Sequence, residues 1–183
     1  AFNFFNEKVK DIISGICVDA TSDYALFSIG KSTFVSLSKD DIIPGEVLKR
    51  GDRRKLYITK VEKTTKGPKV SASRTCKEFV IKLFELNIPE IKDGSIELMG
   101  ISRIPGSRSK VGVMAIKPNL DARGSCIGAG GLRIKAITDE LNQEKIDVFL
   151  WKTDPVDLIA QSLLPARSLS VVIQSTKPKQ ALV

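Results

Sequence analysis

Hydrophobic and polar positions alternate in short runs along the first third of the chain. Runs of this kind, rich in β-branched and aromatic residues and bounded by turn residues, predict β-strands. We predict five strands, at 14–20, 24–29, 32–37, 55–62 and 69–73. The breaks between them carry turn signals such as Thr21-Ser22-Asp23, Gly30-Lys31 and Lys66-Gly67-Pro68. The longer interval 38–52 has room for a short helix or an ordered loop.

Five short strands within roughly 60 residues, with the long connection after the third, are typical of a small OB barrel. We therefore assign residues 12–75 to an OB-type barrel, and a generic five-stranded β domain is the alternative. Residues 1–11 precede the first strand and read as a linker or as the end of a helix.

The pattern changes at Thr75 from a period of two to a helical period. Residues 76–87 place Phe79, Val80, Leu83 and Phe84 on one helical stripe, and Pro89 ends that helix. Two strands are predicted next, at 95–102 and 110–117, joined by a turn at 104–107. The sequence therefore predicts a second unit in which helices pack on a sheet.

Residues 121–142 read as two helical stretches around a glycine-rich loop, and the second stretch buries Ile134, Ile137 and Leu141. A strand follows at 146–151. A further helix is predicted at 154–164, with Asp154 as its N-cap and Pro155 in its first turn. Strands are predicted at 169–174 and from 179 onward. We assign 76–152 to one α+β domain and 153–183 to the beginning of a second one, so the chain reads as a fragment.

The loop between the two helical stretches carries the most specific chemical signal. Cys126-Ile127-Gly128-Ala129-Gly130-Gly131-Leu132-Arg133-Ile134 is an apolar pair followed by G-x-x-G. Glycine permits a tight turn and a close approach of the main chain to a ligand, and free N–H groups at a helix start favour phosphate. KH domains use such a loop to hold about four nucleotides of single-stranded RNA.

Positions Gly128, Ala129, Gly130 and Gly131 are therefore candidate RNA-binding residues. Ile127 and Ile134 either line the groove that receives bases or belong to the core. Other phosphate-binding motifs do not fit, because no G-x-x-x-x-G-K-[ST] occurs and the glycines do not follow a strand closely.

The chain carries a net charge of +8 and a pI near 9.4, which favours a polyanionic partner but also fits a lysine-rich surface. Basic residues flank the candidate sites. In the second domain they are Arg103, Arg108 and Lys110 at the hairpin turn, and Arg123, Arg133 and Lys135 at the glycine loop. In the barrel they are Arg53, Arg54, Lys55, Lys69 and Arg74. Phe27, Phe34 and Tyr57 are candidates for stacking on bases, and we expect at least one of them to be core.

The residue types that catalysis usually needs are scarce. The chain has no histidine, so no histidine-dependent triad or metal site is available. Cys17, Cys76 and Cys126 are far apart, and we expect buried, reduced thiols. No apolar run approaches the roughly 20 residues of a membrane span. We therefore expect a non-catalytic cytoplasmic protein without a cofactor, a metal or a membrane partner.

Several stretches resemble the NusA family of bacterial transcription elongation factors. They are SRTCKEFVIKLFELNIPEI (73–91), ISRIPGSRSKVGV (101–113), LDARGSCIGAGGLRIKAITDELNQEKIDVFLW (120–151) and LLPA (163–166). The resemblance implies an OB barrel of the ribosomal-protein S-one type, a first KH domain of the prokaryotic arrangement and the opening of a second KH domain. By position, 128–131 take the place of the family's RNA-gripping loop, and Arg103, Arg108 and Lys110 that of its basic hairpin.

The resemblance also implies function. A member of this family binds nascent single-stranded RNA and modulates polymerase pausing, termination and antitermination. It contacts RNA polymerase mainly through an N-terminal domain outside this sequence, and other elongation and antitermination factors are further candidate partners. The family often has a basic residue where this chain has Ala129-Gly130, so we expect a weaker clamp.

Two alternatives stay open. The first is an RNA-guiding barrel–KH subunit of a nuclease assembly, and the second is a nucleotide-dependent enzyme that uses the glycine loop. The bridge between the two domains (73–91) favours the NusA-like hypothesis over the first. The lack of a metal or base cluster disfavours the second.

Overall fold

Strands β1 (Ile12–Ala20), β2 (Tyr24–Ser28), β3 (Phe34–Ser38), β4 (Arg53–Thr64) and β5 (Gly67–Ser73) close into a barrel of order β1-β2-β3-β5-β4. The structure is a computed structural model that describes residues 6–164, 166, 171–176 and 179–182. All neighbouring pairs are antiparallel except β3 and β5, which run parallel. The predicted OB barrel is confirmed.

The barrel core follows from period-two alternation. In β3, Val35 and Leu37 are buried, while Phe34, Ser36 and Ser38 are exposed. The core is completed by residues from the other strands, namely Cys17, Ala25, Phe27, Leu56, Ile58, Val70 and Ala72. Strand β4 begins two residues before its predicted start, because its pairing with β1 extends to Ile16 opposite Arg53. The long connection after β3 holds a short 3₁₀ helix, η1 (Lys39–Asp41).

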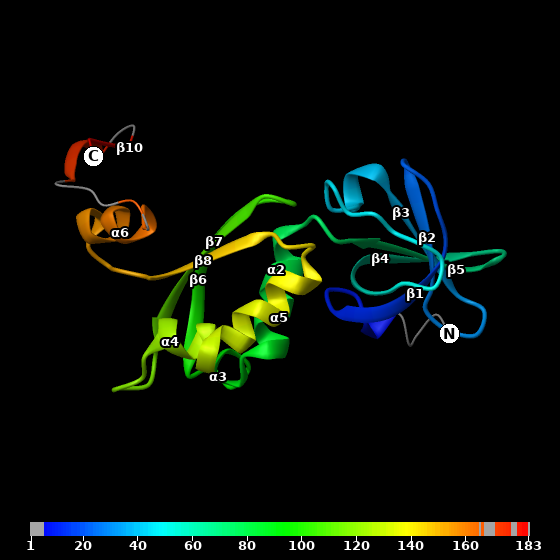
Figure 1. Ribbon diagram of the computed structural model, residues 1–183, viewed down its shortest axis with the longest axis horizontal. Coiled ribbons are helices and arrows are strands. Elements are labelled where there is room, and N and C mark those ends of the chain that lie inside the picture. Colours follow the sequence, from blue (N-terminus) through cyan, green and yellow to red (C-terminus); the bar gives the residue numbers. More distant parts are fainter. Residues whose placement is uncertain (1–5, 165, 167–170, 177–178, 183) are drawn as a thin grey trace.

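The second unit has the order helix-helix-strand-strand-helix-helix-strand. Its elements are α2 (Lys77–Asn87), α3 (Pro89–Lys92), β6 (Ile96–Ile104), β7 (Arg108–Ala115), α4 (Ala122–Ile127), η2 (Ala129–Gly131), α5 (Leu132–Glu140) and β8 (Lys145–Leu150). The sheet order is β6-β7-β8, with β6 and β7 antiparallel and β7 and β8 parallel. Figure 1 shows the helices gathered on one face of this sheet.

The four apolar residues predicted for the first helix, Phe79, Val80, Leu83 and Phe84, are all buried in α2. They pack with Val111, Val113 and Val148 of the sheet and with Ile137 and Leu141. The same cluster includes Ile43 and Tyr57 from the barrel. The hydrophobic core therefore continues from the barrel into the second unit, which fixes one against the other.

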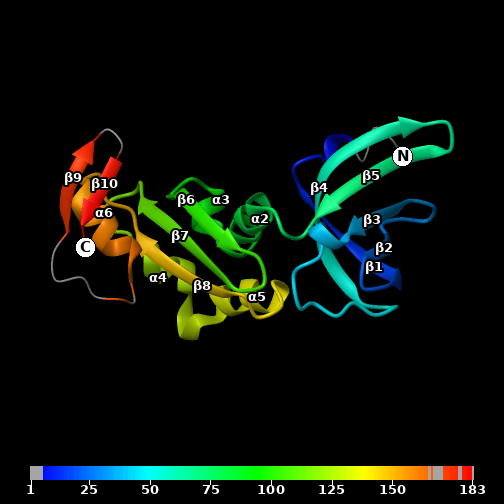
Figure 2. The ribbon, with the colours of Figure 1, turned by 90° about the horizontal axis from the view of Figure 1, so that it is seen from above.

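Figures 1 and 2 show the barrel at one end of the molecule and helix α6 (Pro155–Ser162) with β9 (Val172–Thr176) and β10 (Lys179–Leu182) at the other. Asp154 caps α6 as predicted, since its Oδ1 accepts the Val156 N–H at 2.9 Å. Strands β9 and β10 form an antiparallel pair. The first part of the predicted strand at 169–174 lies outside the described residues.

Candidate nucleic-acid interface

The glycine loop ends α4 and starts α5. Three of its residues have left-handed backbone conformations: φ is 78° at Gly128, 61° at Gly130 and 75° at Gly131. Such φ values are costly for residues with a Cβ. The Gly128 N–H donates to the Gly124 carbonyl at 2.9 Å and closes α4, and the Gly131 N–H donates to the Gly128 carbonyl at 3.0 Å. Helix α5 then begins at Leu132.

The three glycines differ in the space around them. A Cβ on Gly128 would lie 2.8 Å from Cγ of Arg133, whereas a Cβ on Gly130 or Gly131 would have no atom within 4 Å. Ala129 and Gly130 are exposed. The loop is therefore packed at its base and open at its tip, which lies at the N-terminus of a nine-residue helix.

The apolar neighbours of the loop divide between core and surface. Ile134 is half-buried and packs against the hydrophobic core, and Ile127 is also half-buried. Leu132 is 69% exposed, directly after the loop, and sequence reasoning did not single it out. Its position off the stripe formed by Ile134 and Ile137 was the available signal. An exposed leucine beside the loop offers an apolar contact to a ligand.

Two of the three basic residues at the loop are engaged in the fold. Arg133 donates from Nη1 to Oε2 of Glu90 at 2.7 Å and to the Ser125 carbonyl at 2.8 Å. Arg123 donates from Nε to the Val148 carbonyl at 3.0 Å. Lys135 is exposed on α5 and forms a surface pair with Asp139 at 2.7 Å. Their contact with RNA stays a prediction.

The hairpin arginine Arg103 contradicts the sequence-based prediction. Its guanidinium holds the fully buried Glu144 with Nε and Nη2 both at 2.9 Å, and it donates to the Cys76 carbonyl at 2.8 Å. Its side chain is 2% exposed. Because a buried carboxylate must be paired, the hairpin uses Arg103 for its own stability. The prediction that Arg103 contacts RNA is wrong.

The other two hairpin residues are nearer the surface. Arg108 is exposed and lies 3.2 Å from Asp147. Lys110 donates its ammonium protons to the carbonyls of Ser162 and Leu164, at the C-terminal end of α6. A cation is favourable at that end of a helix. Lys110 therefore ties α6 to the sheet, and its contact with RNA stays a prediction.

Arg74 of the barrel is the second contradicted prediction, since its side chain is completely buried. It bonds both carboxylate oxygens of Glu46, at 2.7 and 3.0 Å, and Oε1 of Glu140 at 2.9 Å. It also donates to the carbonyls of Lys55 and Glu140, at 2.6 and 2.8 Å. These bonds join the barrel to the end of α5. The prediction that Arg74 contacts RNA is wrong, because its donors serve this junction.

The remaining basic residues of the barrel divide in the same way. Arg54 pairs with Glu46 at 3.3 Å and with Asp52 at 3.1 Å, and Lys55 pairs with Glu140 at 3.4 Å. Arg53 and Lys69 are exposed. Arg53 thus remains the barrel's candidate for a phosphate contact.

Of the three aromatic candidates, Phe27 and Tyr57 are buried, which confirms that at least one is core. Phe34 is 50% exposed. The register places Ile16 opposite both Arg53 and Ser28, and Ser28 opposite Phe34. Directly opposite residues point to the same face of a sheet, so Phe34, Ile16 and Arg53 cross one exposed face. A hollow of about 350 Å³ beside them is lined by Ser14, Gly15, Ile16, Ser28, Ile29, Gly30, Lys31 and Arg53.

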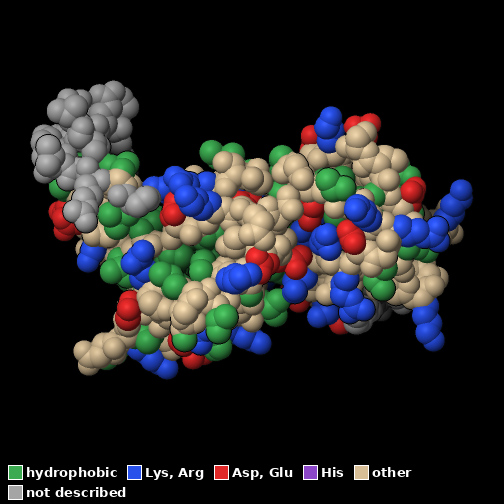
Figure 3. Space-filling view, viewed as in Figure 1, with side chains coloured by type: hydrophobic (Ala, Val, Ile, Leu, Met, Phe, Trp, Pro, Cys, Tyr) green, Lys and Arg blue, Asp and Glu red, His purple; other side chains and the backbone are tan. Residues whose placement is uncertain are grey.

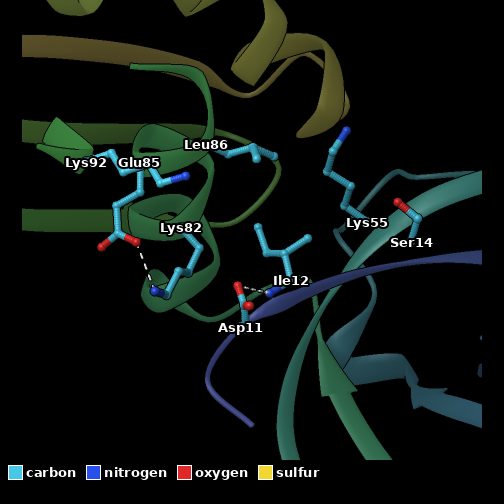
Figure 4. A pocket seen from close by; sticks show the side chains of 8 residues that line it. All are labelled: Asp11, Ile12, Ser14, Lys55, Lys82, Glu85, Leu86 and Lys92. Atoms are coloured by element: carbon cyan, nitrogen blue, oxygen red, sulfur yellow. Dashed lines mark hydrogen bonds and ion pairs between the residues drawn. The ribbon is translucent and has the colours of Figure 1, made fainter. Parts of the chain in front are cut away.

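A cleft of about 580 Å³ separates the barrel from α2 (Figure 4). Its basic side chains include Lys55 and Lys82. Lys82 donates to Glu85 at 2.9 Å, and this hydrogen bond raises the pKa of Lys82. Lys55 is paired with Glu140. Lys92 also lines the cleft, so two of its three lysines have carboxylate partners within the fold.

The described residues do not bring together three or more Cys, Asp or Glu side chains in a group that could hold a metal ion. The three cysteines are free thiols. Burial raises the pKa of all three, and that of Cys126 to about 12. Neutral thiols are poor nucleophiles. None of the helices in the described segments is long and apolar enough to span a membrane.

Comparison with known proteins gives one consistent result. Residues 74–151 match the family of the NusA-like first KH domain. The chain is 39% identical over 182 residues to the transcription termination/antitermination protein NusA of Bacillus subtilis, a match that covers 100% of this chain and 49% of the relative. It is 40% identical to NusA of Halalkalibacterium halodurans, over 98% of this chain and 47% of the relative. It is 35% identical to NusA of Thermus thermophilus, over 97% and 46%.

The chain thus spans about half the length of the curated relatives it matches. The matches run through the barrel as well as the glycine loop and its flanking helices. Sequence similarity and the observed order of barrel and KH elements agree. The chain belongs to the NusA family, and residues 74–151 are its NusA-like first KH domain.

Proposed function

We propose that this chain binds single-stranded RNA at the glycine loop 128–131, without catalysis. The observation that carries the proposal is the open tip of that loop, where Gly130 and Gly131 have positive φ and nothing lies within 4 Å of an added Cβ. A sugar-phosphate backbone can approach such a main chain closely. The N–H groups at the start of α5 and the helix dipole favour the phosphate.

The surroundings of the loop support a nucleic-acid strand as the ligand. Figure 3 shows hydrophobic side chains gathered between α4 and α6, over β8. Bases of a strand held by its phosphates at the loop could lie on such a surface. Ile127 and the exposed Leu132 directly flank the loop in the chain. The net charge of +8 favours a polyanion.

The barrel provides a second proposed contact. Its exposed face carries Phe34 and Ile16, with Arg53 at the edge of the adjoining hollow. An exposed aromatic ring beside a cation is the usual arrangement for stacking a base and contacting its phosphate. We propose that RNA longer than about four nucleotides, the length that a KH loop holds, contacts this face as well.

For the whole protein, we propose the role that the relatives' names state, transcription termination and antitermination. Its nascent RNA would pass over the surfaces described here, and RNA polymerase and other elongation factors would be its protein partners. We further propose domains at 12–75 and 76–152, the beginning of a second KH domain at 153–183, and a cytoplasmic location.

The test is fluorescence anisotropy with a labelled single-stranded RNA and the variants Gly130→Asp and Gly130→Asp/Gly131→Asp. Asp tolerates positive φ better than most residues, and the open space avoids a clash. A carboxylate at the loop repels the RNA phosphate and competes with it for the loop N–H groups, so RNA affinity should fall by about tenfold or more.

Gly94→Asp is the matched control, because Gly94 also has positive φ, has nothing within 4 Å of an added Cβ and lies in the same domain. It should change RNA affinity by less than about twofold if the loop is the site. Equal losses in the loop and control variants would indicate a non-specific charge effect, and unchanged binding in the loop variants would place the clamp elsewhere.

A further inference from the structure

Arg133 occupies an unexpected place for a basic residue beside an anion-binding loop. Its aliphatic part lies against Gly128, where an added Cβ would come within 2.8 Å of Cγ and 3.0 Å of Cβ of Arg133. Its guanidinium bonds the Ser125 carbonyl at 2.8 Å and Glu90 at 2.7 Å. The side chain therefore crosses the base of the loop and links it to α3.

We infer that Arg133 is a positioning residue, which with Glu90 and the Ser125 carbonyl forms a brace that holds the loop in its RNA-binding shape. This inference rests on the proposed function of the loop. A direct phosphate contact by Arg133 is the competing account, since the side chain is 33% exposed.

The brace satisfies groups that the turn leaves without partners. The last four carbonyl groups of a helix accept no hydrogen bond from N–H groups of the same helix. The Ser125 carbonyl is one of these groups in α4. Gly128 closes α4 through the Gly124 carbonyl, which leaves the Ser125 carbonyl to Arg133. A cation is also favourable at the C-terminal end of a helix. Arg133 thus stabilises the point at which the chain leaves α4 for the loop.

Glu90 provides the fixed end of the brace. It lies in α3, two residues after Ile88, which is fully buried in the hydrophobic core. The Glu90 side chain is 28% exposed, so the pair is partly shielded from water. Residues from α3, α4 and α5 are therefore tied together by one guanidinium, and the loop conformation depends on a carboxylate that no nucleic acid would contact favourably.

The two accounts predict opposite changes in RNA affinity for Glu90→Gln. Removing a negative charge near a phosphate site should strengthen RNA binding if Arg133 acts on phosphate. If Glu90 holds the brace, the same change should weaken binding, by about threefold to tenfold, for the loss of a charged hydrogen bond. Glu97→Gln is the matched control, as Glu97 is an exposed carboxylate on β6 of the same domain. It should leave affinity within about twofold of the unmodified protein.

Both bonds of the brace come from Nη1 of Arg133. Arg133→Lys keeps the charge but not the position of that nitrogen, so it should weaken binding and leave the slope of log affinity against log salt concentration unchanged. If Arg133 contacted phosphate, Arg133→Gln, which removes the charge, would reduce that slope by about 0.7. Tighter binding by Glu90→Gln, or an altered salt slope in Arg133→Gln, would overturn the inference.

Amide hydrogen exchange of the RNA-free protein keeps this inference distinct from the proposed function. The brace predicts faster exchange at the Gly128 and Gly131 N–H groups in Glu90→Gln and unchanged exchange there in Glu97→Gln. Faster exchange with unchanged RNA affinity would leave the brace standing and refute RNA binding at the loop. Unchanged exchange in Glu90→Gln would refute the brace.

Discussion

Substitution of Arg74 by methionine tests the buried junction between the barrel and the KH domain. Arg74 is completely buried, makes hydrogen bonds to Glu46 and Glu140, and lies 5.3 Å from the centre of the Phe79 ring. Methionine fills part of the space but leaves two carboxylates without their shared guanidinium. We expect a large loss of stability and only an indirect effect on RNA binding.

The magnitude follows from the contacts that remain. Removing one partner of a buried ion pair costs about 3–5 kcal/mol. Glu46 keeps Arg54 at 3.3 Å and Glu140 keeps Lys55 at 3.4 Å, so the lower end applies, about 3 kcal/mol. For a protein of this size, that corresponds to a decrease in melting temperature of about 6–12 °C.

Urea unfolding measures this loss with two probes. Trp151 is the only tryptophan, and it lies against Gly100 and Gly112 of the KH sheet, so its fluorescence reports that domain. Far-UV circular dichroism reports the whole chain. Because Arg74 joins both domains, both midpoints should decrease in Arg74→Met. Arg53→Met is the control, since Arg53 is exposed and its loss should change stability by less than about 0.5 kcal/mol.

A free energy of unfolding of Arg74→Met within about 0.5 kcal/mol of that of the unmodified protein would refute the structural role of Arg74. A loss of RNA affinity at unchanged stability would also contradict this role, because it would indicate that Arg74 contacts RNA directly.

Three other measurements follow from the structure. Phe34→Ala should weaken RNA binding by about 1–3 kcal/mol through lost stacking, whereas Val47→Ala, which changes a more exposed apolar residue, should not. Equal affinities of the two variants in anisotropy would exclude the barrel face. A plot of log RNA affinity against log salt concentration would have a slope of about −4 for six phosphate contacts. Because Arg74 and Arg103 are buried, we expect four contacts and a slope of about −3. A slope near zero would exclude an electrostatic interface. The pKa of Cys126 is raised from 9.0 to about 12, so its contribution to stability is complete below pH 9 and is lost from there towards pH 12. Urea midpoints should fall less over that range in Cys126→Ala, and parallel profiles would contradict the burial of the thiol.

The fold was largely predictable because it depends on periodicity. Alternation at Val35 and Leu37 and the helical stripe from Phe79 to Phe84 reflect which side of each element meets the core. Turn residues and the Asp154-Pro155 cap gave the breaks. The boundaries moved by one or two residues where pairing with a neighbouring strand extended an element, as between β1 and β4.

The glycine loop was predictable for a different reason. Gly128, Gly130 and Gly131 adopt conformations that other residues rarely reach, so their identity records the local backbone. No tertiary contact is needed to read that signal.

The roles of the arginines were not predictable from the sequence. Arg74 and Arg103 stand close in sequence to candidate sites, but each is paired with a glutamate that is distant in the chain, Glu140 and Glu144. Only the folded topology brings those carboxylates to the guanidinium groups. A basic residue near a motif therefore indicates phosphate contact only after its long-range partners are known.

Amide chemical shifts of the protein, measured by NMR during titration with a short single-stranded RNA, report directly whether RNA binds at the glycine loop. We expect the largest changes at the N–H groups of residues 128–132, and we expect them to be lost in Gly130→Asp/Gly131→Asp but kept in Gly94→Asp. Binding that leaves those N–H signals in place while signals elsewhere move would contradict RNA binding at the loop.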